Sequence, residues 1–240
     1  MKPEAIAVLI PAHNEEKLLP RALAAVNAAA RHPALAGLHV TTVVAADACV
    51  DDTAEVAGSA GASVLHLGSQ NPGKARAAAA QHAMATLGAP ATVTWLASTD
   101  ADSAVPPDWL AFQIDQARAG WEAVVGTVTV TRWPPLPHLA DRHHQLYNAS
   151  RPGFGRPWHH PHVHGANLGV AADAYRSVGG FPALPVGEDH ALVSALVRGG
   201  HRVLRTPGCP VETSSRLHPR AVGGFGDQLA RLAAETGSVH

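Results

Sequence analysis

The first half of the chain alternates between short apolar runs and alanine-rich stretches. Apolar side chains fill the runs and recur every three or four positions in the longer stretches, the two spacings that predict buried strands and amphipathic helices. The predicted strands are 5–10, 39–46, 63–67 and 92–97, and the predicted helices are 15–30, one from about residue 51, and 72–87. Strands that alternate with helices at this pitch predict a mostly parallel sheet covered on both faces.

The second half is less regular. The predicted helices are 106–119, 139–148, 188–197 and 223–236, and the predicted strands are 123–131, 167–171 and 202–205. Between residues 133 and 164 the chain is rich in Pro, His, Arg and Trp. Because there is no internal repeat and no long linker, we expect one domain over residues 1–240.

Composition and charge narrow the class of protein. Of 240 residues, 46% are hydrophobic and 15% charged, which is typical of folded chains and excludes disorder. The formal net charge of −1 does not favour a nucleic-acid partner, and two cysteines are too few for a disulfide framework. No stretch approaches the ~20 apolar residues that span a bilayer. We therefore expect a cytoplasmic protein without a transmembrane segment, and leave a homodimer open.

Polar residues gather directly after four predicted strands, at 11–16, 47–53, 71–76 and 98–102. The carboxyl ends of parallel strands share one crevice, where ligands bind. Taken alone, Glu15 or Asp51 could be only a charge that stabilises a helix start.

The sharpest local signal is Asp100-Ala101-Asp102, directly after a buried strand. Two carboxylates two residues apart on an extended segment point the same way. They are hard oxygen ligands suited to Mg²⁺ or Mn²⁺, which in turn bind diphosphates. A solvated turn is the alternative, and the position after the strand favours the metal.

These motifs, in this order, resemble family 2 glycosyltransferases of the GT-A fold. The motifs are Pro-Ala-x-Asn-Glu, Val-Val-Ala-Ala-Asp, Asn-x-Gly-Lys-Ala, Asp-x-Asp, the segment 164–170 and the Glu188-Asp189 pair. The resemblance covers about residues 5–205 and implies an α/β, doubly wound, mostly parallel (mixed) sheet with helices on both faces. It implies a nucleotide-binding half at 1–103, an acceptor half at 104–210 and a mobile C-terminal segment at 211–240.

The resemblance also implies roles for single residues. Those implied for nucleotide binding are Pro11, Ala12, Glu15, Asp47, Lys74 and Asp100, with Asp47 reading a base that is usually uracil. Asp102 and Asp100 would hold the metal, with His218 as a further candidate, and Arg76 and Arg220 would lie near the diphosphate. Asp189, beside Glu188, would be the general base.

The implied reaction is metal-dependent, inverting transfer of one sugar from a nucleotide-diphosphate sugar, usually a UDP-sugar, to a hydroxyl of a small or soluble acceptor. A metal ion stabilises the departing phosphate, and a positioned carboxylate removes the acceptor proton. The chain lacks the Gln-x-x-Arg-Trp motif and the membrane helices of processive members, which argues against a polysaccharide synthase.

A histidine cluster at 159–164 leads into Gly165, Ala166 and Asn167. Alternation would put His160, His162 and His164 on one side of an extended segment. A structural zinc site is one interpretation, although no cysteine or clustered acid accompanies the histidines. We favour a sugar or acceptor pocket lined by His164, Gly165, Ala166 and Asn167, with Trp158 as a stacking candidate. Such a pocket would make activity sensitive to pH near the histidine pKa of ~6.5.

Two other functions stay open. A sugar nucleotidyltransferase would need a Gly-rich loop with Arg and Lys after the first strand, where this chain has Pro-Ala-His-Asn-Glu-Glu. A non-catalytic domain that binds nucleotide sugars or docks a partner would keep the donor residues without needing Glu188-Asp189.

Overall fold

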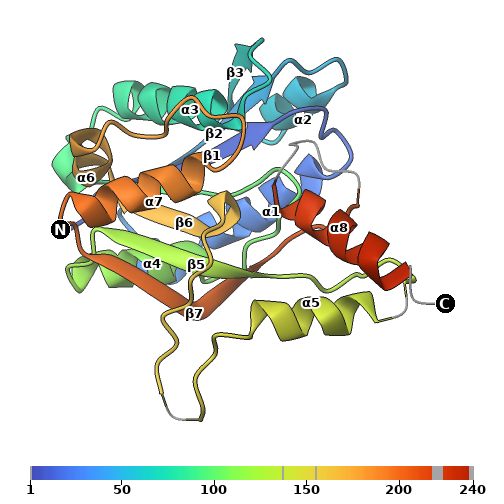
Figure 1. Ribbon diagram of the computed structural model, residues 1–240. Helices are drawn as coiled ribbons and strands as arrows, with labels where there is room; N and C mark the ends of the chain where they lie inside the picture. The colour runs from blue at the N-terminus through green and yellow to red at the C-terminus, as the bar shows by residue number, and fades with distance from the viewer. Residues whose placement is uncertain (1, 137, 155, 218–223, 238–240) are drawn as a thin grey trace.

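Seven strands form a single sheet in the order β3-β2-β1-β4-β6-β5-β7 (Figure 1). The computed structural model describes residues 2–136, 138–154, 156–217 and 224–237. The strands are β1 Ala5–Ala12, β2 His39–Asp47, β3 Ser63–Leu67, β4 Thr94–Ser98, β5 Ala123–Thr129, β6 Leu168–Ala171 and β7 Val203–Glu212. β6 runs antiparallel to β4 and β5, and the other pairs are parallel. The predicted doubly wound, mixed α/β sheet is therefore confirmed.

Helices cover both faces of the sheet. They are α1 Leu19–Ala30, α2 Thr53–Ser59, α3 Pro72–Thr86, α4 Trp109–Arg118, α5 Leu139–Tyr147, α6 Ala172–Ser177, α7 Glu188–Arg198 and α8 Phe225–Gly237. α1 packs against α2 and α4, whereas α3 and α6 each pack against α7. α5 and α8 lie against each other at one side of the molecule (Figure 1). In the part of the chain that is described, no helix is long and apolar enough to cross a membrane.

Every predicted helix and strand occurs in the structure, but several begin or end at other residues than predicted. The first helix begins at Leu19 instead of residue 15, because Asn14 adopts a left-handed conformation and residues 15–18 form a turn. β7 continues to Glu212, well beyond the predicted end at residue 205, and pairs with β5 across an irregularity. The short helix α6 was not predicted. The late start of α1 means that Glu15 is not a helix-start charge.

Asn167 joins three elements of the core, where its buried amide group is hydrogen-bonded within the protein, so its position does not support the predicted contact with sugar or acceptor. Its side chain is 2% exposed. Its amide oxygen accepts from Trp109 Nε1 at 2.9 Å, and its amide nitrogen donates to the carbonyls of Thr127 (2.9 Å) and Cys209 (2.8 Å). These bonds use the amide to tie α4, β5 and β7 together.

The start of α3 lies directly against the loop that leads to α7. A Cβ atom on Gly73 would lie 2.1 Å from the carbonyl oxygen of Pro182 and 2.8 Å from that of Leu184. Asn71 caps the helix by accepting from the backbone N–H of Lys74 at 2.9 Å. Because only glycine permits this contact, the loop before α7 is positioned by α3.

We predict that Gly73→Ala lowers the free energy of unfolding by about 1–3 kcal/mol, since the added methyl group overpacks a backbone contact. Gly58→Ala is the matched control: Gly58 is an exposed residue of α2 whose Cβ would approach no atom closer than 4.0 Å. There, alanine should raise the free energy of unfolding by up to about 1 kcal/mol. Urea denaturation of both variants measures the difference, and equal effects would contradict the close contact.

Candidate active site

A cavity of about 710 Å³ opens at the carboxyl ends of β1, β2 and β4. Its walls come from both halves of the chain and from the segment after β7. The predicted site residues that line it are Pro11, Ala12, Glu15, Asp47, Arg76, Asp100, Asp102, His164, Gly165, Ala166, Glu188 and Asp189. The fold thus brings most of the predicted site into one place.

Asp47, at the end of β2, organises the loop that follows β3. Asp47 is 3% exposed, and its carboxylate accepts from the backbone N–H groups of Ser69 (2.6 Å), Gln70 (3.0 Å) and Asn71 (2.7 Å). Burial would raise the pKa of Asp47, but these bonds outweigh it and hold the pKa below its usual range. The carboxylate is therefore occupied by the loop, and Gln70 and Asn71 of this loop line the cavity beside it.

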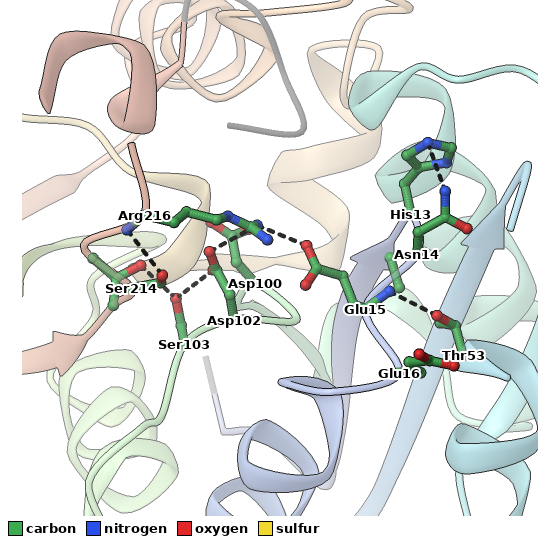
Figure 2. A network of polar contacts seen from close by, with 12 residues as sticks. His13, Asn14, Glu15, Glu16, Thr53, Asp100, Asp102, Ser103, Ser214 and Arg216 are labelled. Atoms are coloured by element: carbon green, nitrogen blue, oxygen red, sulfur yellow. Dashed lines mark hydrogen bonds and ion pairs between the residues drawn. The ribbon is translucent and has the colours of Figure 1, made fainter. Parts of the chain in front are cut away.

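Glu15 is held in the cavity by the turn that follows β1. Its backbone N–H donates to Thr53 Oγ1 at 2.7 Å, and its carboxylate is 5% exposed (Figure 2). The neighbouring Asn14 accepts from the backbone N–H of Val50 at 2.8 Å, which joins the loops after β1 and β2. The turn therefore points the carboxylate of Glu15 toward the end of β4.

Asp100 and Asp102 lie in a turn and not in the extended segment that was predicted. The backbone N–H of Ser103 donates to the carbonyl of Asp100 at 3.1 Å, which closes the turn directly after β4. Both carboxylates still line the cavity. Burial, reinforced by the nearby charges of Asp100 and Glu15, raises the pKa of Asp102 to about 6, although Arg216 opposes the shift.

Arg216 bridges Glu15 and Asp102 from the segment that follows β7. Its Nη2 atom lies 2.6 Å from Oε1 of Glu15 and 2.8 Å from Oδ2 of Asp102. Figure 2 shows the guanidinium group reaching between the two carboxylates. Arg216 was not singled out from the sequence, although it lies close in the chain to the candidates His218 and Arg220. Those two residues lie outside the described part of the chain.

Glu188 and Asp189 begin α7 but face different surroundings. Glu188 is 5% exposed and forms an ion pair with Arg76, which also pairs with Asp100. Burial, together with the charges of Asp189 and Asp100, raises the pKa of Glu188 against the effect of Arg76. Asp189 is only half-buried, and its Oδ2 accepts from the backbone N–H of Gly165 at 2.8 Å. Asp189 is therefore the member of the pair that is available to a ligand.

Three alternating histidines form a stack, as the spacing predicted. The ring centroids of His160 and His162 are 5.8 Å apart, and those of His162 and His164 are 6.1 Å apart. Tyr147 of α5 stacks on His162 at 3.9 Å, and its hydroxyl group hydrogen-bonds Nε2 of His164 at 3.0 Å. His162 and His164 line the cavity, and His160 is fully buried.

Burial keeps this histidine stack neutral. It lowers the pKa of His160 and His162, and lowers the pKa of His164 to about 3, with the neighbouring histidines adding to the shift. The lowered pKa values place the titration of the folded stack below the expected pH of about 6.5. No group of three or more His, Cys, Asp or Glu among the described residues could hold a metal ion, which also removes the support for a zinc site here.

Two further predicted residues do not reach the cavity. Lys74 is exposed on α3 outside the cavity wall. Trp158 is 8% exposed, donates from Nε1 to Ser150 Oγ at 3.2 Å, and packs edge-on against His160 and His162. The ring of Trp158 therefore supports the histidine stack without lining the cavity. The cavity also gains residues that sequence patterns did not indicate, among them Gln70, Phe225 and Gln228.

Comparison with known proteins supplies a family and a fold. The model of the family described as Glycosyl transferase family 2 matches residues 7–179. None of the curated proteins matches the chain.

Solved structures with similar folds include three that hold ligands. Mannosyltransferase PcManGT from Pyrobaculum calidifontis, in complex with GDP-Man and Mn²⁺, has a TM-score of 0.66 at 19% identity over 98% of this chain and 61% of its own. S. aureus TarS 1–349 with UDP-GlcNAc has a TM-score of 0.62 at 16% identity over 97% of this chain and 66% of its own. Mycobacterium tuberculosis glucosyl-3-phosphoglycerate synthase with phosphoglyceric acid has a TM-score of 0.56 at 18% identity over 97% of this chain and 77% of its own. The chain thus spans less than two thirds of the first two, and the likeness shows the fold alone.

We predict that His164 makes the folded protein sensitive to acid well above pH 4. Its pKa is about 3 in the folded chain and ~6.5 when unfolded, so between these values the unfolded state binds the extra proton. Stability is therefore lost as the pH falls through this window, by about 2 kcal/mol from this residue at pH 5.

Urea denaturation at pH 7.5 and pH 5 measures the free energy of unfolding of the wild type, His164→Gln and His159→Gln. His159 is an exposed histidine of the same segment and serves as the control. His164→Gln should lose about 2 kcal/mol less than the wild type between the two pH values, while His159→Gln should behave like the wild type. Parallel losses in all three proteins would show that His164 is not held neutral.

Proposed function

The chain belongs to glycosyl transferase family 2, and from this membership we propose that it transfers a sugar from a nucleotide-diphosphate sugar to a hydroxyl group. The proposal is supported chiefly by the convergence of acidic residues on one cavity. Glu15, Asp102 and Asp189 come from two loops and the start of α7, far apart in the sequence, and all three residues line one cavity. A donor, its leaving group and an acceptor must meet in such a place.

The donor half of the proposal is supported by the ligands of similar folds. PcManGT holds GDP-Man and TarS holds UDP-GlcNAc. We propose that Pro11 and Ala12 lie along the nucleoside of such a donor, with Glu15 at the ribose. This assigns residues 1–103 to the nucleotide and residues 104–210 to the acceptor, with the segment 211–240 contributing Arg216 to the donor site.

The base is left open between uracil and guanine. The expectation of a UDP-sugar rested on Asp47 alone, and the carboxylate of Asp47 is occupied by the backbone of residues 69–71. We propose that the base edge contacts this loop, where the side-chain amide of Gln70 offers a donor and an acceptor. An amide group can serve either base, so the loop fits both.

We propose that Mg²⁺ or Mn²⁺ binds with the donor at Asp100 and Asp102. Among the described residues, the cavity wall carries six carboxylates and two guanidinium groups, an excess of negative charge that would repel a diphosphate. Two carboxylate oxygens suit such an ion, which takes its remaining ligands from phosphate and water. When bound, the ion stabilises the negative charge of the departing phosphate. Arg216 would have to release Asp102 first.

Asp189 is the proposed general base. It is the accessible carboxylate of the Glu188-Asp189 pair, and the N–H group of Gly165 orients it. The acceptor oxygen would form a bond to the anomeric carbon as its proton passes to Asp189, while the bond from that carbon to the diphosphate breaks. A single base and direct displacement predict inversion of the anomeric configuration. Glu188, which is committed to Arg76, takes no part in this proton transfer.

We predict that one of UDP and GDP binds in a Mn²⁺-dependent manner, and that Asp102→Asn weakens this binding by at least about tenfold through loss of a carboxylate ligand. Calorimetric titration of both nucleotides, with and without Mn²⁺, measures the effect. Asp115→Asn, an exposed acid of α4 with its own arginine partner, is the matched control and should bind like the wild type.

The same titration distinguishes binding of the metal ion from binding of the nucleotide. Arg216→Gln frees Glu15 and Asp102, so it should bind Mn²⁺ alone more tightly than the wild type does. If neither nucleotide binds under any condition, the donor assignment fails. Equal nucleotide binding with and without Mn²⁺ would instead remove the metal from the proposal.

Asp189→Asn should lower the rate of transfer by about 10²–10⁴-fold, because the amide keeps the shape of the side chain but cannot accept the proton. Nucleotide binding should be unchanged. Release of UDP or GDP from a panel of sugar nucleotides, with water or small polyols as acceptors, measures the rate. Asp173→Asn, an exposed acid at the start of α6, controls for the charge. No activity in the wild type, with intact nucleotide binding, would favour the non-catalytic alternative.

A further inference from the structure

Arg76 lies at the junction between the proposed donor and base residues. It projects from α3, and its side chain is 5% exposed. Its Nε atom donates to Ser98 Oγ at 3.1 Å, one terminal nitrogen pairs with Asp100, and the other pairs with Glu188. Each of the three nitrogens of the guanidinium group therefore has an oxygen partner inside the protein.

The backbone packs closely around this group. A Cβ atom on Gly165 would lie 2.4 Å from Nη2 of Arg76, so only glycine leaves room for the guanidinium plane. On another side, the ring centroid of Phe181 is 6.0 Å from Cζ. Because all three guanidinium nitrogens have oxygen partners within the protein, these contacts favour a structural role over the expected place of Arg76 near the diphosphate.

The contacts of Arg76 reach the proposed base by two routes. Glu188 is bonded to Asp189 in the chain, and Gly165, which packs on the guanidinium group, donates its N–H to Asp189 at 2.8 Å. Asp100 pairs with Nη2 of the same group, whereas Glu188 pairs with Nη1. One side chain thus holds the end of β4, the segment at Gly165 and the start of α7 in fixed relation.

We propose that Arg76 is a positioning residue for the transfer reaction, setting the distance between Asp100 at the donor and Asp189 at the acceptor. The proposal rests on the proposed function. Bond formation at an anomeric carbon needs the attacking oxygen and the departing phosphate in line, and a displacement of about 1 Å can cost on the order of 10²-fold in rate. Arg76 touches neither reactant and acts through the carboxylates.

Arg76→Lys tests this, because lysine keeps the charge but cannot pair with Ser98, Asp100 and Glu188 through one rigid fork. We expect kcat to fall by about 10²-fold while the KM for the donor and the Kd of the nucleoside diphosphate stay unchanged. Arg118→Lys, in an exposed pair with Asp115, is the matched control and should change nothing. A raised KM and Kd with kcat intact would make Arg76 a donor ligand and overturn the proposal, as would unchanged kinetics.

Crystal structures of the wild type and Arg76→Lys give a test that needs no turnover. The separation of the Asp100 and Asp189 carboxylates should change, and the bond from Gly165 to Asp189 should lengthen or break. Identical carboxylate positions in both crystals would overturn the positioning role even where the wild type is active. An inactive wild type with displaced carboxylates in the variant would instead contradict the proposed function alone.

Thermal unfolding shows whether a variant has simply failed to fold. If Arg76→Lys does not fold, the double variant Arg76→Gln, Glu188→Gln replaces the buried ion pair by two amides and leaves no unpaired charge at Glu188. The double variant should fold and still show the loss of kcat at an unchanged donor KM. A folded double variant with wild-type kcat would overturn the proposal.

Discussion

Buried negative charge at one edge of the sheet is the constraint around which this molecule is arranged. A carboxylate removed from water is costly unless a positive group or hydrogen bonds compensate it. The chain uses three different solutions: backbone N–H groups surround Asp47, Arg76 is shared between Asp100 and Glu188, and Arg216 bridges Glu15 and Asp102. The first two belong to the interior, whereas Arg216 comes from a segment beyond the last strand. Only the third could be exchanged for a ligand without disturbing the sheet.

The backbone at this edge is strained at residues that follow three of the strands. Asn14, Ala48 and Gln70 follow β1, β2 and β3, and all three have positive φ angles of 54°, 53° and 46°. Such conformations cost a residue with a side chain on the order of 1–2 kcal/mol. Hydrogen bonds sustain them, since Asn14 accepts from Val50 and Asp47 accepts from the loop that contains Gln70. The strain lies at the strand ends that face the cavity, which is where functional strain is usually found.

Sequence patterns predicted the order of elements and the residues that meet at the sheet edge, because both depend on local periodicity and on the direction of parallel strands. They did not predict which member of a polar cluster faces the cavity. Asn167 and Gly165 are two residues apart, yet one ties core strands together and the other packs on Arg76. The role of Arg216 depends on a contact across more than a hundred positions, which no spacing within one segment can reveal. For the same reason, Asp47 suggested a base-reading residue, although its partners come from another loop.

Charge also divides the cavity into two sides. The loops after β1 and β4 carry Glu15, Asp100 and Asp102, whereas the wall formed by His162, His164 and Phe225 is polar or aromatic and uncharged at neutral pH. A neutral imidazole can donate and accept hydrogen bonds without adding to the electrostatic field. That wall therefore suits the hydroxyl group of the proposed acceptor, and the carboxylate side suits a cation with a diphosphate. Arg76 pairs with Asp100 and with Glu188, the neighbour of Asp189, so the proposed metal ligand and the proposed base are linked through a single buried guanidinium group.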